Sequence, residues 1–94
     1  MIMTEQCEFV KRYSEIDGLQ DGRTVTYTAR AIPEGIYMSV KQENGKSVNT
    51  EECVCQSVCF EQAVSFLKYI YENSIDLGGW YEVLLDMDVQ FTAA

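Results

Sequence analysis

Histidine is absent from this 94-residue chain. Its absence removes the side chain that most readily exchanges protons near neutral pH, and with it most catalytic triads and mixed histidine–cysteine metal sites. The chain also lacks a glycine-rich phosphate loop and a calcium loop with the required ligand spacing. We therefore expect a protein that is not an enzyme and that uses no cofactor.

Long apolar runs are absent as well. No segment approaches the ~20 apolar residues that a membrane-spanning helix requires. The first residues, 1–6, have neither the basic start nor the apolar stretch of a secretory signal. We expect a cytoplasmic protein without membrane contact, and the length predicts a single domain over residues 1–94.

Basic residues are scarce and unevenly placed. The chain has 7 Lys and Arg against 15 Asp and Glu, a formal net charge of −8. Lys68 is the only basic residue in 51–94, so nearly all the negative charge arises in this part of the chain. Direct nucleic-acid binding needs the opposite sign, because its affinity comes largely from neutralised phosphates. The charge therefore favours a basic protein surface as partner, although many acidic proteins are charged only for solubility.

The first half of the sequence alternates with the period of β-strands. Residues 23–31 place Val25, Tyr27 and Ala29 on one face and threonines on the other, as in a half-exposed antiparallel strand. Asn44-Gly45 is a strong hairpin signal, because both residues tolerate positive φ. Short links favour a four-stranded antiparallel meander. The expected strands span about 7–13, 23–32, 35–43 and 47–55.

The second half has helical periodicity. Apolar residues recur at steps of three and four from Phe60 to Tyr71, with Ser57 as candidate N-cap, and predict a helix over about 58–73. A second helix is expected over about 79–90, with an apolar stripe that includes Trp80, Met87 and, as a further candidate, Phe91. The fold class is thus α+β in two layers, the two C-terminal helices covering one face of the sheet.

The last helix carries more apolar surface than one stripe. Tyr81, Leu85 and Val89 follow each other at steps of four beside the main stripe. This strip is either additional core or a contact surface, and as a contact surface it would support a homodimer.

Four cysteines raise the question of a metal site. Cys53, Cys55 and Cys59 form a C-x-C-x₃-C cluster, whereas zinc sites usually contain two close pairs. Cys53 and Cys55 share a strand face, and Cys59 is expected just inside the start of the first helix. The simpler interpretation is that these cysteines pack as small apolar residues. The alternative is a thiolate metal-binding or redox-sensing domain.

Parts of the C-terminal segment resemble a known group of proteins. Residues 61–67, 71–75 and 80–86 resemble a family of small uncharacterised proteins from anaerobic Gram-positive bacteria, with a fainter similarity at 25–31. That resemblance implies a strand-rich first half and a helical second half that ends in an acidic, apolar helix. It implies no activity for any residue.

These observations favour a small acidic interaction protein. Its expected role is that of a regulator or inhibitor of a basic partner, for example a phage or mobile-element inhibitor of a nucleic-acid-handling system such as an anti-CRISPR protein. The predicted partner-binding residues are Glu51, Glu52, Glu61, Glu72, Asp76, Tyr81, Glu82, Leu85, Asp86 and Asp88.

Overall fold

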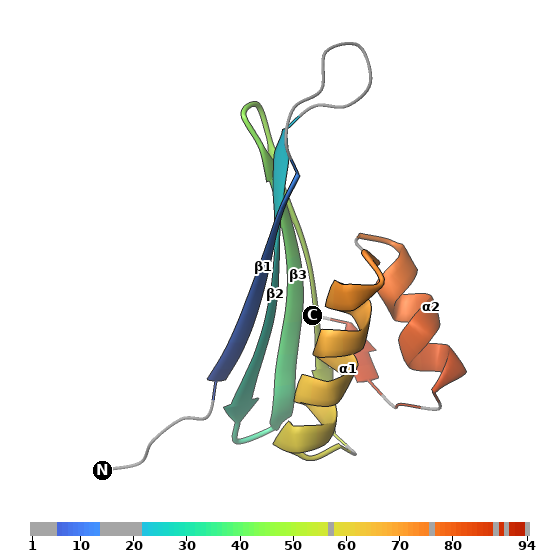
Figure 1. Cartoon of the computed structure of the whole chain (residues 1–94). Helices are drawn as coiled ribbons and strands as arrows, with labels where there is room; N and C mark the ends of the chain where they lie inside the picture. The colour runs from blue at the N-terminus through green and yellow to red at the C-terminus, as the bar shows by residue number, and fades with distance from the viewer. Residues whose placement is uncertain are drawn as a thin grey trace.

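The computed structural model describes residues 6–13, 22–56, 58–75, 77–87, 89 and 91–93. An antiparallel sheet with strand order β1-β2-β3-β4-β5 forms one layer of the molecule, and two helices lie on one side of it (Figure 1). This confirms the α+β class and the antiparallel meander with its two C-terminal helices. The four long strands are β1 (Gln6–Tyr13), β2 (Arg23–Ile32), β3 (Gly35–Asn44) and β4 (Val48–Cys55).

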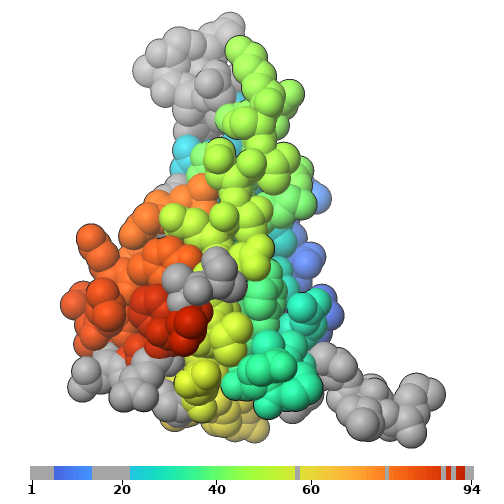
Figure 2. All heavy atoms as spheres, turned by 180° about the vertical axis from the view of Figure 1, so that it is seen from behind, coloured from blue at the N-terminus to red at the C-terminus, as the bar shows by residue number. Residues whose placement is uncertain are grey.

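The C-terminal segment differs from the predicted long helix. Helix α1 spans Phe60–Glu72 and α2 spans Gly79–Asp86, and the chain then returns as a short fifth strand, β5 (Phe91–Ala93), beside β4. The prediction of helix to residue 90, with Phe91 on its stripe, is wrong. The unpaired edge of β4 offers backbone hydrogen bonds to the returning chain, which a longer helix would leave unmade. Seen from behind, the C-terminal residues lie between α2 and β4 (Figure 2).

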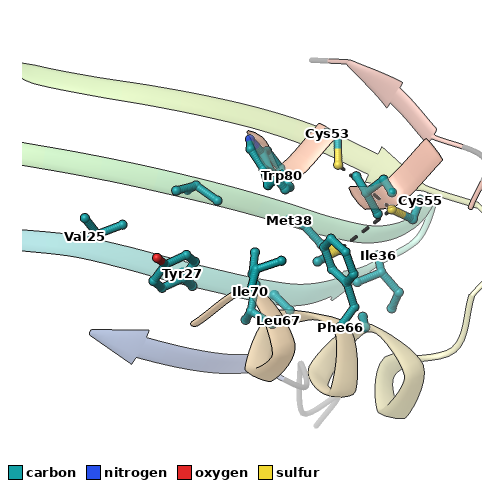
Figure 3. Packing of buried hydrophobic residues seen from close by; sticks show 14 residues of the cluster. Val25, Tyr27, Ile36, Met38, Cys53, Cys55, Phe66, Leu67, Ile70 and Trp80 are labelled. Atoms are coloured by element: carbon teal, nitrogen blue, oxygen red, sulfur yellow. Dashed lines mark hydrogen bonds between the residues drawn. The ribbon is translucent and has the colours of Figure 1, made fainter. Parts of the chain in front are cut away.

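Alternation along the strands sorts the side chains into two faces, as the sequence predicts. The face toward the helices is apolar and fully buried at its centre, where Tyr27, Met38 and Cys53 are at most 1 % exposed. Helix α1 adds Leu67 and Ile70 to this core, and α2 adds Trp80 (Figure 3). The two layers are therefore held together mainly by apolar burial.

The hairpin between β3 and β4 forms at the predicted place by another means. Neither Asn44 nor Gly45 has a positive φ. Instead, the Asn44 side-chain oxygen accepts hydrogen bonds from the backbone N–H groups of Lys46 and Ser47 at 2.9 and 2.8 Å. Asparagine stabilises this turn through its side chain, a common alternative to positive φ.

The start and end of α1 are both stabilised by local contacts. Cys59 is the N-cap residue, and its backbone N–H donates to the Gln62 side chain at 3.0 Å. Ser57, the predicted cap, lies outside the described residues. At the other end, the Lys11 ammonium donates to the Tyr71 carbonyl and to the Ser74 hydroxyl at 3.0 and 2.7 Å. A cation here also opposes the negative end of the helix dipole.

None of the helices in the described ranges combines the length and apolar character needed to cross a bilayer.

Candidate functional site

The exposed charges differ between the two layers. The outer face of the sheet carries equal numbers of acidic and basic side chains: Glu8, Arg12, Arg30, Lys41, Glu43 and Glu52. On the helices the charges do not balance, since Lys68 is the only cation among the described helical residues. Four carboxylates are exposed there: Glu61, Glu72, Glu82 and Asp86. The negative charge of the described residues is therefore concentrated on the helical layer.

Two of the predicted acidic residues lie elsewhere. Glu51 points to the inner side of β4, where its Oε1 atom accepts hydrogen bonds from the Gly78 backbone N–H at 2.7 Å and from the Trp80 indole at 3.0 Å. Glu52 points to the outer face, beside Tyr37. Burial and the charge of Glu52 raise the pKa of Tyr37, although a hydrogen bond with Ser39 opposes them. The Glu51 carboxylate is thus engaged in hydrogen bonds within the fold.

The remaining two predicted carboxylates, Asp76 and Asp88, lie outside the described residues. The structure therefore brings four predicted carboxylates to the helical layer: Glu61, Glu72, Glu82 and Asp86. Among the ten predicted partner-binding residues, only these four and Leu85 are exposed on the described helices.

The predicted strip on α2 divides between core and surface. Tyr81 is half-buried, its ring stacks on Phe91 with centroids 5.5 Å apart, and its hydroxyl donates to the Glu52 carbonyl at 2.9 Å. Val89 packs against the core, whereas Leu85 is 65 % exposed. Burial of the aromatic ring and the charge of Glu51 raise the pKa of Tyr81. Only Leu85 remains available as a contact.

An open groove separates the two helices. It has a volume of about 760 Å³, and its floor includes Met38, Cys55 and Leu84. Its walls come from α1, from the residues just before it and from the residues that follow α2, and include Tyr69 and Met87. Its size falls in the range of ligand-binding pockets, and it is open rather than enclosed.

The groove contains residues that the sequence reasoning did not identify as a site. The sequence pattern predicts no functional role for Tyr69 and places Met87 on the apolar stripe of the second helix. In the structure the Tyr69 side chain is 46 % exposed and the Met87 side chain is 48 % exposed. Met87 is exposed because α2 ends at Asp86, so the residue caps the helix instead of continuing its apolar stripe. Tyr69 follows Gln62 by two helical turns, and both line the groove. That spacing is the signal in the sequence that could have revealed this second, groove-facing stripe.

The cysteines occupy two different environments. Cys53 and Cys55 are fully buried with sulfur atoms 3.9 Å apart, and Cys59 is exposed at the start of α1. The described residues bring together no group of three His, Cys, Asp or Glu side chains able to hold a metal, so Cys53, Cys55 and Cys59 do not form one. Hydrogen bonding to Cys55 and burial raise the pKa of the Cys53 thiol, which stays protonated at neutral pH.

Comparison of the chain with models of protein families, with characterised proteins and with solved structures finds no match.

Proposed function

We propose that this protein is a non-catalytic binding protein whose helical layer binds a basic, amphipathic segment of a partner protein. The observation that carries the proposal is the coincidence of an open apolar groove with the four exposed carboxylates of the same layer: Glu61, Glu72, Glu82 and Asp86. The balanced outer face of the sheet has no comparable combination among its described residues.

The groove supplies the apolar part of the recognition. An amphipathic helix binds by placing its apolar side chains in a groove between helices. The exposed side chains of Tyr69, Leu85 and Met87 on this layer add apolar area at the surface. Methionine adapts to different partner side chains because its chain is flexible and its sulfur polarizable.

The carboxylates orient the bound partner segment and accelerate its association. Glu61 lies at the rim of the groove, on the first turn of α1, and Asp86 lies at the end of α2. Lysine or arginine side chains that flank the apolar stripe of a partner would face these charges. Complementary charges of this kind accelerate association and select the partner, and salt screens them.

The sign of the field also defines the class of partner. A negative layer repels phosphates, so the proposed ligand is protein and not nucleic acid. Proteins that handle nucleic acids carry basic surfaces, and occupation of such a surface by this layer would inhibit them. We therefore propose inhibition or regulation of such a protein as the biological effect, as an anti-CRISPR protein would exert.

A synthetic helical peptide provides the direct test. It contains lysines on one side and leucines at helical spacing on the other, and its affinity is measured by fluorescence anisotropy at low and high salt. Neutralising the helical layer (Glu61→Gln, Glu72→Gln, Glu82→Gln and Asp86→Asn together) should weaken binding by about tenfold or more. The matched control Glu8→Gln with Glu43→Gln, on the outer face, should leave it unchanged.

A second peptide in which serine replaces the leucines separates groove binding from general attraction between opposite charges. The proposal requires that this peptide bind much more weakly, and that Met87→Lys weaken the leucine peptide. Equal affinity for both peptides, or equal losses in the two charge variants, would contradict it. If light scattering shows a dimer that Leu85→Lys dissociates, the layer binds a second copy of the chain instead.

A further inference from the structure

Two contacts link three sulfur atoms on the inner face of the sheet. The Sγ atoms of Cys53 and Cys55 are 3.9 Å apart, and the Cys55 Sγ atom lies 3.8 Å from the Sδ atom of Met38 (Figure 3). The backbone enforces this arrangement. Cys53 and Cys55 alternate onto the same face of β4, and Met38 on β3 pairs directly with Cys53.

Two of the sulfur–sulfur separations match those of ligands around one metal ion. Metal–thiolate bonds of about 2.3 Å place sulfurs about 4 Å apart in a trigonal arrangement and slightly closer in a tetrahedral one. The Cys53–Cys55 and Cys55–Met38 sulfur separations agree with either geometry. Two thiols and a thioether are soft donors, and such sets select Cu(I) among the metals available to proteins.

We propose that Cys53, Cys55 and Met38 form a binding site for a single Cu(I) ion. Binding forms three copper–sulfur bonds and displaces the two thiol protons to solvent, and the copper stays in the +1 state, so no oxidant or reductant takes part. The thioether of Met38 is neutral and contributes a third bond without adding charge. Two of its ligands line the floor of the groove proposed to bind the peptide, but the proposal of this site does not rest on peptide binding.

The groove between the helices is the side from which the site is approached. Met38 and Cys55 line its floor, although Cys53, Cys55 and Met38 are each at most 1 % exposed, so entry of the ion requires the surrounding side chains to move. Glu61 at the rim of the groove attracts a cation toward it. Neighbouring core residues exclude water from the sulfurs, which favours a soft, weakly hydrated ion over Mg²⁺ or Ca²⁺.

The experiment uses the whole chain under anaerobic, reducing conditions. Cu(I) is supplied as its coloured complex with bathocuproine disulfonate, and loss of the colour measures transfer to the protein. We expect transfer of one Cu(I) per chain and an X-ray absorption spectrum with three sulfur neighbours. Circular dichroism before and after the titration establishes that the chain stays folded.

Variants test each ligand separately. Cys55→Ser should abolish transfer, and Met38→Leu should weaken it by about tenfold or more, since loss of an outer-shell partner alone costs that much. Leucine keeps the volume of methionine, so Met38→Leu is expected to fold and decides the outcome even if Cys55→Ser does not. Cys59→Ser and Cys7→Ser are the matched controls and should bind like the natural chain.

Three results would overturn the assignment. The first is absence of stoichiometric transfer to the folded natural chain. The second is a Cys59→Ser variant that loses as much affinity as Cys55→Ser, because the exposed thiol would then be a ligand. The third is a Met38→Leu variant with unchanged affinity and sulfur count, which would remove the thioether from the site.

Discussion

Glu51 of β4 accepts the indole N–H of Trp80 at 3.0 Å, and the same carboxylate oxygen accepts the backbone N–H of Gly78. One side chain of the sheet therefore fixes both the first turn of α2 and the orientation of its largest buried residue, since Trp80 is completely buried. Gly78 has a φ of 86°, a conformation that glycine adopts readily, and this turns its N–H toward the sheet. The carboxylate thus stabilises the N-terminus of the helix as an anion.

Replacement of Glu51 should destabilise the fold. We expect Glu51→Ala to lower the free energy of unfolding by about 2–3 kcal/mol, because a buried indole N–H loses its acceptor. Urea unfolding followed by the fluorescence of Trp80, the only tryptophan, measures this. The control Glu82→Ala removes an exposed carboxylate from the same helix and should change the value by about 0.5 kcal/mol or less. Equal losses in both variants would show that the two hydrogen bonds contribute little.

Gly35 should be far less replaceable than Gly45. At Gly35, φ is 145°, and an added Cβ would lie 2.4 Å from the Cys55 carbonyl oxygen on β4. We expect Gly35→Ala to cost about 1–3 kcal/mol through backbone strain, with the contact adding to it. Gly45 has open space around the Cβ position, so Gly45→Ala should stay within about 0.5 kcal/mol of the natural chain. Thermal unfolding of the two variants compares them, and similar losses would refute the strain argument.

Lys11 should stabilise the packing of α1 on β1. Its ammonium bridges the Tyr71 carbonyl and the Ser74 hydroxyl, 60 and 63 residues away in the chain. We expect Lys11→Met to cost about 1–2 kcal/mol, since charged hydrogen bonds at the end of a helix are lost. Lys68→Met provides the comparison, because its 3.8 Å ion pair with Glu72 is exposed and should contribute about 0.5 kcal/mol or less. A larger effect at Lys68 in urea unfolding would contradict this order.

Leu84 and Leu85 are neighbours on α2 with opposite environments. Leu84 is 1 % exposed and Leu85 is 65 % exposed. Leu84→Ala should lower the free energy of unfolding by about 3 kcal/mol through lost burial and the cavity it leaves. Leu85→Ala should change it by about 0.5 kcal/mol or less. Denaturant unfolding distinguishes the two, and a large loss at Leu85 would show that the residue packs against the protein or against a second copy.

Stability should fall in alkaline solution, and Tyr81 should contribute to the fall. The pKa of Tyr81 in the folded chain is raised by burial and by the charge of Glu51, so the protonated phenol stabilises the fold. This contribution is complete below pH ~10, the ordinary pKa of tyrosine, and is lost as the pH rises through the higher folded value. Tyr81→Phe should cost about 1 kcal/mol at neutral pH and flatten the decline above about pH 10. An unchanged slope of unfolding free energy against pH would contradict the assignment.

Local sequence patterns determined the four long strands, helix α1 and the two faces of the sheet. Alternation along 23–31 predicts the inner position of Val25, Tyr27 and Ala29, because successive side chains of a strand point to opposite faces. The spacing of apolar residues likewise predicts α1 to within about two residues at each end. The excess of carboxylates in the second half is also a property of the sequence alone. These features depend on contacts between residues close in the chain, which composition and period reveal.

Tertiary contacts decided which of those carboxylates are exposed and which are engaged within the fold. Glu51 and Glu82 are both carboxylates in the acidic half, yet only packing of α2 against β4 commits Glu51 to Trp80 and leaves Glu82 exposed. The end of α2 and the return of β5 depend on the unpaired edge of β4, which no local pattern records. The groove between the helices, and the meeting of Met38 with Cys53 and Cys55, arise from strand register and layer packing. Long-range partners determine these features, because a side chain's hydrogen bonds and burial depend on residues that are distant in the sequence.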